Sequence, residues 1–139
     1  MISASRFLTR AAALVLILAA AALDGGPARA DDSFPFGLEI TLDAARQPGS
    51  KRVPSLDIGD AGEVILELWC KGGKGQFSVA GNTVIFVAGP LEERSCPPAR
   101  AQADDELVAA LSEATTWKRQ GDFVSFVGTR PLRFRINTN

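Results

Sequence analysis

The stretch EVILELWC, residues 63–70, carries the strongest strand signal in the chain and sets the expected fold class. Its apolar residues alternate, so that Val64, Leu66 and Leu68 share one face, as in a half-buried β-strand. Glycine and proline punctuate the chain on both sides of this stretch and separate further short extended segments. These segments are residues 37–42, 55–58, 76–79, 83–87, 123–127 and 132–136.

A single helix is predicted among these strands, over residues 99–115. Pro98 suits its first turn, where the missing N–H leaves no helical hydrogen bond unmade. The order of strands, helix and strands predicts an α+β domain, in which an antiparallel β-sheet curls around or packs on the single α-helix. The apolar stripe of this helix, at helical spacing, consists of Ala103, Leu107, Ala110, Leu111 and Ala114.

The glycines at positions 72, 73 and 75, with Lys71 and Lys74 among them, interrupt the strand pattern. A phosphate-binding loop would need a different spacing and a final Lys-Ser or Lys-Thr pair. We therefore expect a hairpin or loop turn at this position.

Residues 1–30 have the form of a cleaved secretory signal peptide. Arg6 and Arg10 precede an unbroken apolar run over residues 11–23. A membrane-spanning helix needs about 20 apolar residues, and this run ends at Asp24. We therefore expect no stable membrane anchor after cleavage.

The predicted cleavage site follows small residues, Ala28 and Ala30, so that the mature chain begins at Asp31. Residues 31–139 are enough for one domain with a single core. An exported chain of this kind is expected in the periplasm.

The composition excludes several classes of chemistry. The chain contains no histidine and only two cysteines, so Ser–His and Cys–His nucleophile pairs and histidine-based zinc sites are absent. No cofactor or metal is expected. Of 15 basic and 16 acidic residues, three basic and one acidic belong to the signal. The mature net charge of −3 gives no electrostatic footprint for nucleic acid.

Cys70 and Cys96 are the two cysteines, and an even count in an oxidising compartment predicts a disulfide. Two buried free thiols or a redox-active pair are the alternatives. The pair lacks the Cys-x-x-Cys spacing of a typical redox site.

Three acidic residues in succession, Asp104, Asp105 and Glu106, are the candidate carboxylates for acid/base or metal chemistry. Neighbours on a helix point about 100° apart and suit a shared site poorly. A solvated acidic turn in the N-terminal half of the helix is therefore the preferred interpretation.

Two tryptophans, Trp69 and Trp117, either pack in the core or form the walls of a ligand groove. Arg133 and Arg135 alternate on the exposed face of the last strand. They are expected to form a solvated face or to protect a sheet edge, with an anionic partner as the alternative.

The mature chain resembles the META domain family of HslJ-like, heat-inducible envelope proteins. The resemblance implies a compact, β-rich envelope domain linked to stress tolerance or secretion, and it supplies no catalytic residues. Members often carry Asn directly after the first Cys, where this chain has Lys71. In chain order, the matching pieces are PSLDIG, WC, GNTVIF, ERSCPP, QADDELVAALSEATTW, GDFVSF and PLRFRI.

These observations predict a non-catalytic periplasmic META-like protein that acts as a binding or envelope stress-tolerance module. Its expected partner is an envelope protein or a hydrophobic ligand held where the sheet and the helix part. A carboxylate-based hydrolase and a thiol-redox protein that uses the cysteine pair are the alternatives.

Overall fold

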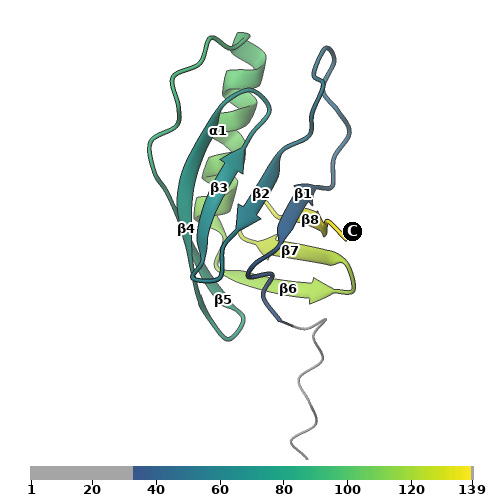
Figure 1. The fold of residues 1–139 in the computed structure, drawn as a ribbon, viewed down its shortest axis with the longest axis vertical. Coiled ribbons are helices and arrows are strands. Elements are labelled where there is room, and N and C mark those ends of the chain that lie inside the picture. The colour runs from purple at the N-terminus through teal and green to yellow at the C-terminus, as the bar shows by residue number, and fades with distance from the viewer. Residues whose placement is uncertain (1–32, 139) are drawn as a thin grey trace, which may run out of the picture.

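Antiparallel strands, each hydrogen-bonded to the next in sequence, close into a barrel in the computed structural model, which describes residues 33–138 (Figure 1). The strands are β1 (Glu39–Leu42), β2 (Ser55–Ile58), β3 (Glu63–Glu67), β4 (Gly72–Ala80), β5 (Thr83–Ala88), β6 (Thr116–Gln120), β7 (Phe123–Val127) and β8 (Leu132–Ile136). The helix α1 (Pro98–Glu113) lies between β5 and β6 in sequence. Figure 1 shows β6 and β7 running steeply across the direction of β3 and β4.

The closure of the barrel overturns the predicted α+β sheet curled around a helix. β8 pairs with β1 as well as with β7, with Ile40 opposite Ile136. Closure leaves no sheet edge at the first and last strands. The inward-facing side chains of the strands therefore fill the barrel, and the strands do not curl around the helix.

Aromatic side chains fill the interior of the barrel. The rings of Phe77 and Phe126 stack with centroids 5.4 Å apart, and Phe134 meets Phe126 edge-on. Phe34 contacts Phe77 and Phe126 and is only 6% exposed. Phe34 lies before the first strand, and its ring completes this aromatic cluster.

Helix α1 follows β5, whose pairing with β6 is the shortest in the barrel. β5 and β6 share one residue pair, Thr83 opposite Thr116. The helix packs against β5, and Leu107 and Leu111 enter the same core as the barrel residues. The predicted helix is confirmed, with Pro98 in its first turn. Within residues 33–138, no helix combines the length and apolar character needed to cross a membrane.

The glycines at positions 72, 73 and 75 lie inside β4, so the predicted turn is wrong. A Cβ at Gly73 would lie 3.0 Å from Cδ2 of Leu91, and one at Gly75 would lie 2.7 Å from the ring of Phe86. These positions are glycine because other groups pass close to the strand, which is a recognised use of glycine in sheets.

The strand predicted over residues 63–70 ends earlier, at Glu67. Its buried face is confirmed, since Val64, Leu66 and Leu68 are all in the core. Beyond the strand, the N–H of Leu68 donates to the carbonyl of Lys71, and the chain reverses into β4. The candidate site is built around this reversal.

Candidate functional site

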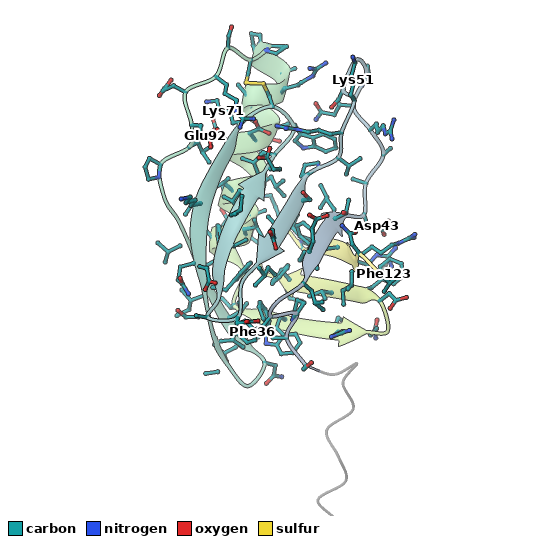
Figure 2. The ribbon with its side chains drawn as sticks, viewed as in Figure 1. Phe36, Asp43, Lys51, Lys71, Glu92 and Phe123 are labelled. Carbon is teal, nitrogen blue, oxygen red and sulfur yellow. A yellow bond between two sulfur atoms is a disulfide. The ribbon has the colours of Figure 1, made fainter. Side chains whose placement is uncertain are left out.

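The disulfide between Cys70 and Cys96 is present, as predicted. It links the reversal after β3 to the segment that leads into α1, with the two Cα atoms 6.0 Å apart. We call the part of the barrel that carries this bond and Lys71 the disulfide end (Figure 2). No described cysteine is free. The segment that leads into α1 is thereby tied to the barrel wall.

Asp104 of α1 holds the same reversal from the helix side. Its side chain is completely buried, and its oxygens accept the N–H groups of Trp69 at 2.7 Å, Cys70 at 3.2 Å and Lys71 at 2.8 Å. Hydrogen bonds to a carboxylate are stronger than those between neutral groups. Asp104 therefore acts as a clamp on three consecutive backbone amides.

The acidic residues of α1 separate into two environments. Asp105 and Glu106 are exposed, and Glu106 accepts a hydrogen bond from Gln102. The expected solvated acidic turn is thus wrong for Asp104. Its place in the helical pattern was the available signal, since it lies three residues before Leu107 and seven before Leu111, on the apolar stripe.

No shared carboxylate site is assembled from these three residues. The buried oxygens of Asp104 face backbone amides, while its two neighbours face solvent. Across residues 33–138, no group of three acidic, cysteine or histidine side chains is placed to hold a metal ion.

Arg52, which no sequence pattern indicated, also binds this reversal. Its guanidinium donates to the carbonyl oxygens of Leu68 and Cys70, both at 2.8 Å, and to Glu67 at 2.9 Å. Arg94 also donates to the Cys70 carbonyl, at 3.1 Å. Carbonyls and amides of the reversal are therefore bound by side chains of opposite charge, which makes it a rigid platform.

Trp69 belongs to this platform. It is 8% exposed and forms part of the wall of a hollow of about 340 Å³ at the disulfide end. Trp117 is 9% exposed, and its indole N–H donates to the carbonyl of Gly81 at 2.9 Å. It lies beside the β4–β5 turn, next to a second hollow of about 400 Å³. Each tryptophan is buried and also borders a hollow, but the structure does not bring the two into one groove.

The outer face of β8 differs from expectation. Protection of a sheet edge is wrong as a role for Arg133 and Arg135, because β8 is hydrogen-bonded on both sides. Arg133 forms an ion pair with Asp43. Both guanidiniums lie over the ring of Phe123, at 4.6 and 5.2 Å from its centroid. Figure 2 shows Asp43 and Phe123 close together on this side of the barrel.

The predicted signal peptide, with Ala28, Ala30 and the start of the mature chain at Asp31, lies outside the described residues. No family model, curated protein or solved structure matches this chain. The resemblance to the META domain family and the predicted export stay predictions.

Proposed function

We propose that this chain is a non-catalytic, META-like module of the periplasm that supports envelope stress tolerance by binding. The observation that carries the proposal is the role of Asp104. The one buried carboxylate among the described residues holds backbone amides, so it is committed to holding the chain in place. A carboxylate-based hydrolase would need a carboxylate free to exchange protons with a substrate.

The packing of the barrel supports binding on its outer surface. Phe34, Phe77 and Phe126 occupy the interior, whereas a ligand-carrying barrel leaves that space open. The place where sheet and helix meet is filled by Leu107 and Leu111. The hollows beside Trp69 and Trp117 remain as binding positions for an envelope protein or a small ligand.

Genetic complementation tests the proposal. Deletion of the gene should reduce survival under heat and detergent stress in the source organism, and the wild-type chain should restore it. The double variant Asp105→Asn/Glu106→Gln removes both exposed carboxylates of the acidic run and should restore survival equally. If this variant is folded by circular dichroism and fails to complement, the hydrolase is the better explanation.

The location is tested in the same strain. The intact mass of the protein recovered from the periplasm should correspond to a chain that starts at Asp31. A full-length chain retained in carbonate-washed membranes would contradict the predicted cleavage and export.

A further inference from the structure

The hollow at the disulfide end lies between the loop of residues 49–52 and the first turn of α1. Trp69 forms part of its wall, and three cations, Lys51, Arg52 and Arg100, are among the other residues that line it. Among the described residues, no carboxylate belongs to this lining. Figure 2 shows Lys51 at the tip of the loop between β1 and β2, at the same end of the molecule as Lys71. This is a concentration of positive charge on a chain whose net charge is −1.

Two of these cations have no counter-ion among residues 33–138. Within the described part of the chain, neither Lys51 nor Arg100 forms an ion pair with a carboxylate. The guanidinium of Arg100 has one long hydrogen bond, from Nη2 to the carbonyl of Pro48 at 3.5 Å. Most of its five donors are therefore available to a ligand. Arg52 differs, because it is fixed by Glu67 and by the carbonyls of the reversal.

The backbone of the loop is shaped to pass close to Arg100. Gly49 has a φ of 74°, in the left-handed region that favours glycine. A Cβ at this position would lie 2.9 Å from Nη2 of Arg100. The loop thus approaches the helix at a glycine and places Lys51 on the same hollow as Arg100.

We propose that this hollow binds a phosphate monoester, with the phosphate between Lys51 and Arg100 and the body of the ligand against Trp69. A phosphate monoester has up to two negative charges and several acceptor oxygens, which match one ammonium and one guanidinium. A single carboxylate has one negative charge and two acceptor oxygens, so it would neutralise the two cations only in part. The proposal rests on the proposed function, namely that the chain acts by binding, and it names the chemistry of the ligand.

The second hollow is a poorer match to this chemistry. Lys118 and Arg119 line it beside Trp117. Arg119 already donates to the carbonyl oxygens of Gly121 at 3.1 Å and Ser33 at 3.2 Å. The indole N–H of Trp117 is also used, in its bond to Gly81. Lys51 and Arg100 therefore offer the stronger anion site.

Titration with phenyl phosphate tests the proposal, since this probe has a phosphate monoester and an aromatic body. In ¹H–¹⁵N spectra of the mature chain, the backbone amides of residues 49–52 and the indole of Trp69 should shift together. The double variant Lys51→Gln/Arg100→Gln should weaken binding by about tenfold or more, the scale of a lost charge-assisted hydrogen bond.

A matched control removes the same charge elsewhere. Lys74 and Arg135 are exposed, and neither lines the hollow beside Trp69 or the one beside Trp117. Lys74→Gln/Arg135→Gln should leave the affinity for phenyl phosphate within about twofold, a few tenths of a kcal/mol. No shift of residues 49–52, an equal loss in both double variants, or shifts centred on Trp117 would each overturn the proposal. Urea denaturation of both variants checks that they are folded.

Two sources of the phosphate are separated by a second measurement. Vesicles of phosphatidylcholine with a minority of phosphatidic acid present the monoester as a lipid headgroup. Co-sedimentation with these vesicles, but not with pure phosphatidylcholine, and competition by phenyl phosphate would identify a headgroup site. Binding of phenyl phosphate alone would identify a soluble ester. If phenyl phosphate does not bind while the stress phenotype is complemented as above, this inference fails and the proposed function stands.

Discussion

Asp104 contributes to the fold through the hydrogen bonds that its buried carboxylate accepts. A carboxylate inside a protein is costly unless hydrogen bonds replace its water. Here, three backbone N–H groups of the reversal after β3 donate to the carboxylate in place of water. Those amides would also lack partners without Asp104, because they follow the last ladder residue of β3. The helix and the barrel wall are thus joined by a polar contact in an otherwise apolar core.

Replacement of Asp104 by Asn should destabilise the fold strongly. The amide nitrogen of Asn would face an N–H group, and one buried donor would lose its acceptor. We expect a loss of about 2–4 kcal/mol in the free energy of unfolding, measured by urea denaturation. Asp105→Asn on the exposed face is the matched control and should change stability by about 0.5 kcal/mol or less. Equal stability of the two variants would contradict the clamp.

The elements with alternating side chains were predictable from the sequence, and those without them were not. Residues 83–87 are predicted as extended, and they form most of β5, because Val84 and Phe86 alternate with exposed residues. The first half of β4 was missed because its glycines have no side chains to alternate. Its strand character comes from pairing with β3, where Gly73 lies opposite Leu66. Such tertiary pairing overrides local propensity.

A larger residue at Gly75 should be tolerated poorly. A Cβ there would meet the ring of Phe86 at 2.7 Å and the carbonyl oxygen of Val87 at 2.9 Å. We expect Gly75→Ala to cost about 1–3 kcal/mol through overpacking. Lys74→Ala, on the neighbouring exposed position of the same strand, should cost about 0.5 kcal/mol or less. A thermal melt of both variants gives the comparison, and a more stable Gly75→Ala protein would contradict it.

The disulfide adds a covalent link between two elements that are also joined by hydrogen bonds, among them the one from Arg94 to the Cys70 carbonyl. It closes a loop of 26 positions between the end of β3 and the segment before α1, for which the chain-entropy model gives about 3–4 kcal/mol. Cys70→Ser/Cys96→Ser should therefore lower the free energy of unfolding by roughly that amount. Thiol titration of the denatured, unreduced wild-type protein should find no free thiol, and titration after reduction should find two. Two thiols before reduction would contradict the bond.

For the molecule as a whole, closure of the barrel was not accessible from sequence patterns. The alternation of buried and exposed residues in a strand is the same in an open sheet and in a barrel. What distinguishes them is the pairing of β1 with β8, elements that lie at opposite ends of the described chain. The candidate site has the same origin, because residues 49–52, Trp69 and Arg100 come from three separate segments.

The barrel also depends on a residue close to the predicted start of the mature chain. Phe34 packs edge-on against Trp117 and contacts the Phe77–Phe126 pair, whereas Phe36 is 41% exposed. Removal of the Phe34 ring would open a cavity beside Phe77, Phe126 and Trp117. In a chain that starts at Asp31, we expect Phe34→Ala to lower the free energy of unfolding by about 3–5 kcal/mol.

Phe36→Ala is the control for this variant, because it removes the same ring from a position that solvent already reaches. It should cost clearly less than Phe34→Ala in the same urea titration. An equal loss of unfolding free energy in the two variants would contradict the packing of Phe34 in the core. A larger cost for Phe34→Ala would show that the barrel needs the chain from Phe34 onward. The predicted cleavage before Asp31 would keep Phe34 in the mature chain, whereas a cut after Phe34 would remove part of the core.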